Sequence, residues 1–273
     1  MTALEDSEHR GYTRAYEEFD SPLMQQVRRE SYGEDIGQHS WVTAEDLEED
    51  IARLELSPDS RLLDWGCGPG GPLTFVIARV GCRGCGADVS PLAIAAGRAR
   101  AAALGIEARV SFQEADLNQP VPFDPASFDA VMSLDVILHL QDRLAVFREV
   151  ARLLVPGRRF LFTDAGVVTG AISNEEIQWR SLHGHSQFVA PGFNERTLEL
   201  GGLKLIERRD RTASLLKNAR GRLAARQAHC AELGALEGTT AYQQEQQYLQ
   251  TVIALSERGA LARLVYVAES RAR

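Results

Sequence analysis

The stretch Leu62-Leu63-Asp64-Trp65-Gly66-Cys67-Gly68-Pro69-Gly70-Gly71 decides the fold of this 273-residue chain. An apolar segment ends on an acid, and a glycine-rich turn then leads into a helical pattern. Gly66, Gly68 and Gly71 have the spacing of the dinucleotide fingerprint, in which glycine lets backbone N–H groups approach a ligand closely. Taken alone, the glycines predict a site for an adenosine-type cofactor.

Asp64 separates two classes of such cofactors. It stands two residues before the first glycine, where a nicotinamide-binding fold usually keeps an apolar strand residue. A carboxylate here can hold an ammonium group, which S-adenosylmethionine carries at its methionine end and NAD lacks. We therefore expect S-adenosylmethionine. An NAD-type oxidoreductase is the remote alternative, which the absence of a recognisable Tyr-x-x-x-Lys pair weakens further.

Further acids follow the next strand-like segments of the chain. Asp88 comes 24 residues after Asp64 and follows the segment 82–87, as expected for an acid that binds both ribose hydroxyls. Asp116 follows the third strand-like run and can accept from an adenine amino group, and Asp135 ends a fourth run. Because ligands of open α/β sheets bind at the carboxyl ends of the strands, these acids predict one ligand site.

Strand and helix patterns alternate through the centre of the chain. This alternation predicts an α/β fold with a doubly wound, mostly parallel sheet. Helices are predicted at 71–80, 91–104, 141–154 and 195–200. Strands are predicted at 82–87, 109–112, 128–135, 159–163, 203–207 and 264–268, in addition to the strand that ends at Asp64.

We expect one large domain with four parts. These are an N-terminal helical lid (1–57), a cofactor-binding core (58–165), a substrate cap (166–193) and the C-terminal part of the sheet (194–273), with a helical insertion at about 212–259. The insertion is predicted as two polar helices, broken near 234–240, that can reach the substrate. In the lid, Thr43 is predicted to cap a helix, with Asp46 as the reciprocal acid.

The composition excludes several classes of protein. Hydrophobic residues make up 44% of the chain and charged residues 25%, as in ordinary globular proteins. The net charge of −8 argues against a nucleic-acid groove, and no apolar run approaches the roughly 20 residues that span a bilayer. The N-terminus lacks a signal-peptide pattern, and the four cysteines predict neither disulfides nor a zinc site. We expect a cytoplasmic monomer or homodimer without a metal.

The order of these motifs resembles the class I S-adenosylmethionine-dependent methyltransferases, strongly over residues 60–165 and loosely beyond. The first motif, the ribose acid and the Leu-Val-Pro-Gly turn at 154–157 fall in family order. The resemblance implies a seven-stranded Rossmann-like sheet with an N-terminal helical lid and helical insertions, and S-adenosyl-L-methionine as cofactor. The cofactor contacts that it implies are Ser40, Asp64, Gly66, Cys67, Gly68, Gly70, Asp88, Val89, Asp116, Leu117 and Leu134.

The segment 133–140, Ser-Leu-Asp-Val-Ile-Leu-His-Leu, narrows the resemblance to small-molecule amine methyltransferases of the phosphoethanolamine and sarcosine/dimethylglycine type. Histidine is a natural base at neutral pH, so His139 is the predicted proton acceptor. In the phosphoethanolamine enzymes a lid tyrosine pairs with this histidine, and Tyr12 is the best match here. The predicted catalytic set is His139, Tyr12 and Asp135. The alternatives are that His139 caps a helix or binds Asp135, and that Tyr12 is a packing anchor.

The substrate is less well defined by the sequence. The phosphobase enzymes carry a tyrosine after the acid that ends the fifth strand, whereas this chain reads Asp164-Ala165-Gly166. The predicted substrate-binding residues are Arg180, His183 and His185. We predict methyl transfer to a nitrogen of a small molecule. The alternatives are an O-methyltransferase of a hydroxylated secondary metabolite and a non-catalytic cofactor-binding module.

Overall fold

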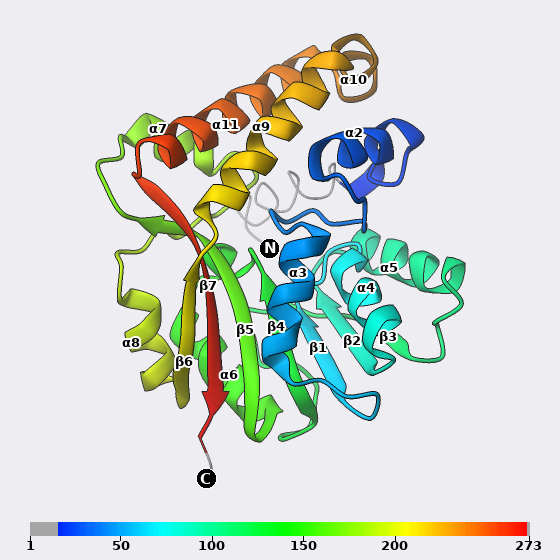
Figure 1. The fold of residues 1–273 in the computed structure, drawn as a ribbon, viewed down its shortest axis with the longest axis vertical. Coiled ribbons are helices and arrows are strands. Elements are labelled where there is room, and N and C mark those ends of the chain that lie inside the picture. The colour runs from blue at the N-terminus through cyan, green and yellow to red at the C-terminus, as the bar shows by residue number, and fades with distance from the viewer. Residues whose placement is uncertain (1–15, 272–273) are drawn as a thin grey trace.

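A seven-stranded sheet runs through the computed structural model, which describes residues 16–271 (Figure 1). The strand order is β3-β2-β1-β4-β5-β7-β6, and β7 alone is antiparallel to its neighbours. This confirms the predicted doubly wound, mostly parallel sheet. The strands are β1 (Arg61–Trp65), β2 (Arg83–Asp88), β3 (Val110–Glu114), β4 (Phe128–Leu134), β5 (Leu154–Val168), β6 (Leu203–Asp210) and β7 (Leu261–Ser270).

Helices bury both faces of the sheet, as a parallel sheet requires. Neighbouring residues of β1 point to opposite sides, so Leu62 belongs to one core cluster and Leu63 to the other. The helices that pack on the Leu62 side are α3 (Ala44–Ile51), α4 (Gly71–Val80) and α5 (Pro91–Ala103). Those on the Leu63 side are α6 (Arg143–Leu153) and α8 (Phe193–Leu200).

Local signals in the sequence place the helix starts. Gly70, in the left-handed conformation, precedes α4, and the Ser90 side chain caps α5 by accepting from the backbone of Ala93. Thr43 caps α3 as predicted, by accepting from the N–H of Asp46. The Asp46 carboxylate does not complete a reciprocal cap in the structure. It instead contacts the Arg211 guanidinium at 3.3 Å, because the chain beyond β6 packs against this end of α3.

Several predicted boundaries differ from the structure by a few residues, and two differences are larger. Strand β5 extends beyond 159–163 in both directions, because the main chain becomes extended at Leu154 and α6 ends one residue earlier. The insertion contains three helices instead of two, with breaks at His229 and Gly238. Its helices are α9 (Thr212–Ala228), α10 (Cys230–Glu237) and α11 (Thr239–Glu257).

The insertion helices α9, α10 and α11 form a crown beyond the carboxyl ends of the parallel strands (Figure 1). Helix α2 (Pro22–Tyr32) packs against α9, and α7 (Asn174–Arg180) packs against α11. Helices from the N-terminal part, the predicted cap and the insertion therefore pack together near the carboxyl ends of the parallel strands. Within residues 16–271, no helix is both long enough and apolar enough to cross a membrane.

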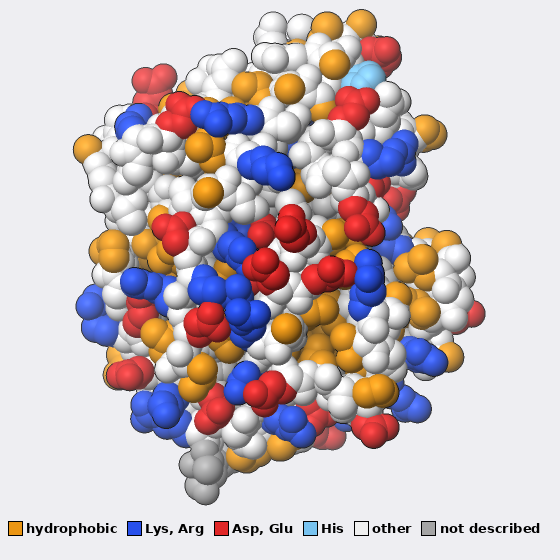
Figure 2. All heavy atoms as spheres, in the orientation of Figure 1, with side chains coloured by type: hydrophobic (Ala, Val, Ile, Leu, Met, Phe, Trp, Pro, Cys, Tyr) orange, Lys and Arg blue, Asp and Glu red, His pale blue; other side chains and the backbone are white. Residues whose placement is uncertain are grey.

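Acidic and basic side chains are intermixed on the face seen in Figure 2. One group lies where the end of β6 meets α3. There Arg209 contacts Asp50 at 2.6 Å, and Arg211 contacts Asp46. The predicted lack of a nucleic-acid partner stays a prediction.

The ring of Phe112 fixes the distance between α5, β2 and the glycine turn. A Cβ atom built on Gly70, Gly86 or Gly97 would come within 2.9 Å of this ring. Glycine at these positions therefore lets a large aromatic side chain fill the space beneath the turn.

We expect Gly97→Ala to lower the free energy of unfolding by about 1–3 kcal/mol, because the added Cβ would lie 2.5 Å from Phe112. Gly234→Ala is the matched control, since Gly234 also lies in a helix but has open space around its Cβ position. Both variants gain the same helix propensity. The difference between their free energies of unfolding therefore reports the clash with Phe112. Urea unfolding measures it, and equal stability of the two variants would show that Phe112 yields freely.

Candidate active site

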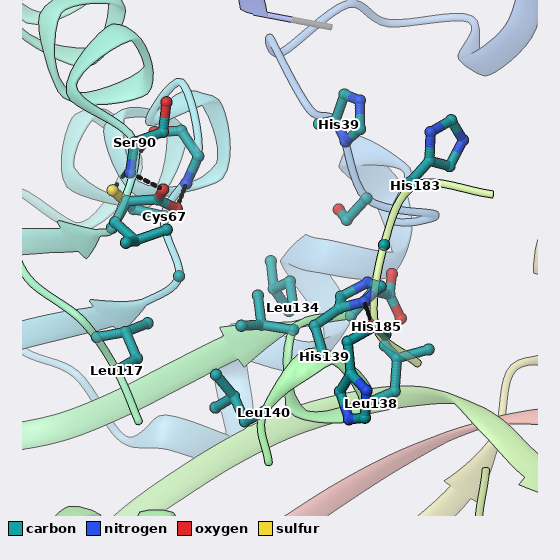
Figure 3. A pocket seen from close by; sticks show the side chains of 18 of the residues that line it. His39, Cys67, Ser90, Leu117, Leu134, Leu138, His139, Leu140, His183 and His185 are labelled. Atoms are coloured by element: carbon teal, nitrogen blue, oxygen red, sulfur yellow. Dashed lines mark hydrogen bonds between the residues drawn. The ribbon is translucent and has the colours of Figure 1, made fainter. Parts of the chain in front are cut away.

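A pocket of about 320 Å³ lies between the carboxyl ends of the strands and the crown. Figure 3 shows its two ends, with Leu134 and Leu140 between them. Cys67 and Ser90 lie at one end, and His39, His139, His183 and His185 gather at the other.

The glycine turn forms the floor of the first end. Gly66 and Gly68 have positive φ angles of 81° and 50°, which side chains with a Cβ rarely adopt. The N–H groups of Gly66 and Cys67 both donate to the carbonyl of Ala87 on β2, at 2.8 and 3.1 Å. A Cβ on Gly66 would collide with Val136 at 2.5 Å. The turn is therefore held tightly against β2 with its backbone exposed to the pocket.

Asp88 ties the turn to the next loop. Its carboxylate accepts hydrogen bonds from the N–H groups of Gly68 and Ser90, each at 2.9 Å. Burial raises the pKa of Asp88, and these N–H groups partly offset that effect. Asp88 is thus positioned by the main chain at the pocket wall.

Asp64 has no comparable support. Its side chain is 2% exposed, lines the pocket, and has no hydrogen bond or ion pair within residues 16–271. Burial, together with the charge of Asp88, raises the pKa of Asp64 well above its usual value. A buried carboxylate without a cation is costly, so this position is suited to binding a positively charged group.

Ser40 lines the pocket from the N-terminal segment. Its Oγ is buried and has no hydrogen-bond partner in the described part of the chain, although its residue lines the pocket. The hydroxyl of Tyr32 donates to the Ser40 carbonyl at 2.9 Å. Ser40 is therefore a residue of the pocket wall whose buried hydroxyl has no hydrogen-bond partner within residues 16–271.

The pocket collects every predicted cofactor residue except one. Gly70 lies behind the turn against Phe112 and does not line the pocket. Asp116 is exposed at the rim and accepts from the backbone of Asn118 at 2.9 Å. The other predicted residues that line the pocket are Ser40, Asp64, Gly66, Cys67, Gly68, Asp88, Val89, Leu117 and Leu134.

His139 lies at the other end of the pocket, in the short helix η2 (Ile137–His139). Its Nδ1 is 2.7 Å from the carbonyl oxygen of His185. Because a carbonyl oxygen only accepts, Nδ1 carries the proton in the neutral ring and Nε2 is the basic nitrogen. Burial is the main cause that lowers the pKa of His139 to about 4. The hydrogen bond to the His185 carbonyl opposes this effect, and the charge of Arg180 adds a smaller lowering of the pKa. The imidazole is therefore neutral at pH 7.

The other two members of the predicted catalytic set differ. Tyr12 lies outside the described residues. Asp135 lines the pocket, but its carboxylate accepts from Arg263, from the N–H of Trp41 and from the Thr163 hydroxyl. The protein itself engages this carboxylate, which argues against the predicted catalytic role.

The predicted substrate residues surround His139. Arg180 is 4% exposed and donates to the Tyr248 hydroxyl at 2.8 Å and to the Ala165 carbonyl at 3.2 Å. It has no acidic partner within residues 16–271. His183 contacts Glu245 at 3.1 Å, and His185 contributes its carbonyl to His139.

Residues of the insertion and Trp41 also build this end and were not predicted individually. Arg222 of α9 pairs with Glu245 at 3.0 Å and lies 4.8 Å from the Trp41 ring, which in turn stacks on Tyr248. The sequence predicted only that the insertion can reach the substrate. Isolated Arg and Tyr residues in polar helices carry no signal that distinguishes a pocket position from a solvated one.

Within residues 16–271, no group of three or more His, Cys, Asp or Glu side chains is arranged to hold a metal ion. The pocket therefore offers hydrogen bonds, carboxylates, guanidinium groups and an imidazole.

Comparison with known proteins identifies the domain. Residues 63–162 match the family model described as a methyltransferase domain. The methyltransferase GfsG of Streptomyces halstedii is 37% identical over 122 residues, which are 45% of this chain and 43% of that protein. The glycine/sarcosine/dimethylglycine N-methyltransferase of Actinopolyspora halophila is 30% identical over 65% of this chain and 31% of its own length. An O-methyltransferase of Pyrenophora dematioidea is 29% identical over 58% of this chain and 59% of its own length.

The matches to GfsG and to the A. halophila enzyme thus span less than half of those relatives.

Solved structures share the fold. Phosphoethanolamine N-methyltransferase 2 of Haemonchus contortus, in complex with phosphomonomethylethanolamine and S-adenosylhomocysteine, aligns with a TM-score of 0.79 and 20% identity, over 95% of this chain and 60% of that one. The cyclopropane synthase MmaA2 of Mycobacterium tuberculosis aligns with a TM-score of 0.81 and 16% identity, over 98% and 99%. Residues 63–162 of this chain thus match a methyltransferase domain, and the chain has the fold of solved methyltransferase structures.

Proposed function

We propose that this protein transfers the methyl group of S-adenosylmethionine to a nitrogen of a small-molecule acceptor. One observation carries the proposal. A single pocket contains a buried carboxylate that has no cation among residues 16–271, Asp64, and a neutral imidazole, His139, beside a buried guanidinium, Arg180. The first group fits a cationic nucleoside, and the other two fit an acceptor that must be held and deprotonated.

The residues of the first end fit this cofactor. Asp64 and the backbone of the glycine turn would hold the methionine ammonium group, and Ser40 of the pocket wall is a further proposed contact. Asp88 would bind the ribose hydroxyls, and Asp116 and Leu117 would face the adenine. When bound, the cofactor supplies an electrophilic methyl group. The protein's own contribution is to align the acceptor, exclude water and accept a proton.

His139 is the proposed proton acceptor. Its Nδ1 is committed to the His185 carbonyl, which fixes the tautomer and makes Nε2 the basic nitrogen. Tyr12, which lies outside the described residues, remains its proposed partner from the lid.

Arg180 is the proposed anchor for an anionic group of the acceptor. A buried guanidinium without a carboxylate is stabilised when such a group binds. The same positive charge lowers the pKa of a nearby ammonium group, which favours the neutral amine that can attack a methyl group. The cap and α11 supply the other contacts through His183 and Tyr248.

An oxygen acceptor is the second candidate, supported by the relative named as an O-methyltransferase. The protein should be incubated with labelled S-adenosylmethionine and separate panels of amines, phenols and carboxylates, and the products identified by mass. Labelled amines alone would support the first proposal, and labelled phenols or carboxylates alone would favour the second. The cytoplasmic location and the monomeric or homodimeric state stay predictions.

We expect Asp64→Asn to weaken binding of S-adenosylhomocysteine by about 10- to 100-fold, because a hydrogen bond to a charged group is worth about 1.5–3 kcal/mol. Asp88→Asn should have an effect of the same size. Isothermal titration calorimetry measures both, with the exposed Asp59→Asn as control. Unchanged affinity in the Asp64 and Asp88 variants would refute the proposed cofactor contacts.

His139→Ala should lower kcat by about 100-fold or more, the usual contribution of general base catalysis. It should leave S-adenosylhomocysteine affinity within about twofold of wild type. Single-turnover kinetics and calorimetry separate the two effects. A variant with normal turnover would show that the acceptor loses its proton elsewhere.

The pH dependence follows from the neutral imidazole. Since the pKa of His139 is about 4 in the free protein, this residue is in its basic form throughout pH 6–9. For an amine acceptor, kcat/KM should therefore keep rising with pH towards the pKa of the free amine. A plateau that begins near pH 7 with an amine of higher pKa would contradict this assignment.

A further inference from the structure

Arg263 is a fully buried charge in the last strand of the sheet. It lies in β7 opposite the point where the register of β5 shifts, between Asp164 and Val167. Its Nε lies 2.9 and 3.2 Å from the two carboxylate oxygens of Asp135, and its Nη2 lies 3.1 Å from one of them. The side chain thus crosses from β7 to the end of β4, 128 residues away in the chain.

Asp135 transmits this contact to the N-terminal segment. It directly follows β4 with a φ of 60°, a conformation that costs energy for a residue with a side chain. Thr163 accepts from its N–H at 2.7 Å and donates to its carboxylate at 2.8 Å. The other carboxylate oxygen accepts from the N–H of Trp41 at 2.9 Å. Arg263 and Thr163 together fix the carboxylate that holds Trp41.

Trp41 is also held from the crown. Its carbonyl accepts from the Asn218 side chain at 2.6 Å, and the carbonyl of the preceding Ser40 accepts from Tyr32. Ser40 and Trp41 are therefore fixed by the sheet, by α9 and by α2. The Oγ of Ser40 is buried, has no partner within residues 16–271, and belongs to the pocket wall.

We propose that Arg263 is a positioning residue that, through Asp135 and the backbone of Trp41, fixes the Ser40–Trp41 segment of the pocket wall and so supports cofactor binding. The inference rests on the proposed function for the identity of the ligand. Without Arg263 the buried carboxylate has no cation, so its charged form is disfavoured and its acceptor strength falls. The Ser40–Trp41 segment then loses one of its three fixed points.

The test compares the full-length chain with Arg263→Met and Arg263→Lys, using calorimetric binding of S-adenosylhomocysteine and thermal unfolding. Arg263→Met should weaken binding about 10-fold. Arg263→Lys keeps the charge but loses the two-point geometry, so it should recover part of the affinity. Asp135→Asn should behave like Arg263→Met, because it keeps an oxygen for Trp41 and removes the charge.

Arg226→Met is the matched control. Arg226 is also buried and contacts both oxygens of a carboxylate, that of Glu237, at 2.9 and 2.6 Å, but neither residue lines the pocket. It should lower the melting temperature and leave the dissociation constant unchanged. This separates loss of a buried ion pair from loss of positioning.

Unchanged affinity in the Arg263 variants, with a melting temperature lowered as in Arg226→Met, would overturn the positioning role. If Arg263→Met does not fold, Arg263→Lys and Asp135→Asn decide by the same criterion. A wild-type protein that releases no heat with S-adenosylhomocysteine would refute the proposed function, and the positioning role with it. Normal wild-type binding with unaffected variants would refute the positioning role alone.

Discussion

Buried carboxylates at the carboxyl edge of the parallel sheet are the constraint on which this structure depends. Each must be stabilised, because a charge removed from water costs several kcal/mol without a partner. Asp88 is stabilised by backbone N–H groups, and Asp135 by Arg263. Asp64 has neither within residues 16–271. The three acids occupy equivalent edges of neighbouring strands, yet only Asp64 is left for a ligand with a positive charge.

Helix α7 and the crown place charges of the opposite sign near this edge of the sheet. Arg180 and Arg222 reach the pocket from α7 and α9, and Glu245 of α11 compensates Arg222 and contacts His183. Burial acts to raise the pKa of Glu245, but these two partners hold it well below its usual range. The Arg180 guanidinium has no acidic partner within residues 16–271. The insertion thus does more than cover the sheet, since it supplies the polarity of the second half of the pocket.

Much of the fold and of the cofactor end could be predicted because the signals are local. The signals for the glycine turn, for the start of α4 at Gly71 and for the acids near the ends of β1 and β2 all come from residues close together in the chain. The break at His229 carries no glycine or proline, so the sequence showed two helices where there are three. The Arg263–Asp135 pair joins residues 128 positions apart. Pattern and spacing do not report such contacts, and for that reason Asp135 resembled a catalytic acid.

Asp64 and Arg180 place opposite charges at the two ends of the pocket. This separation gives a physical reason why the cofactor would bind at one end and the acceptor at the other. A cationic nucleoside is attracted to the end that contains Asp64 and repelled by Arg180, whereas an acceptor with an anionic group meets the opposite field. Leu134 and Leu140 lie between the two ends and keep the region between them apolar. In the proposed transfer, positive charge moves from the sulfonium to the acceptor. Because the region is apolar, water screens this charge little, and the fixed charges of the protein act on it more strongly than they would in water. In this proposal, the opposite charges of Asp64 and Arg180 both select the end at which each ligand binds and align the two ligands for the transfer.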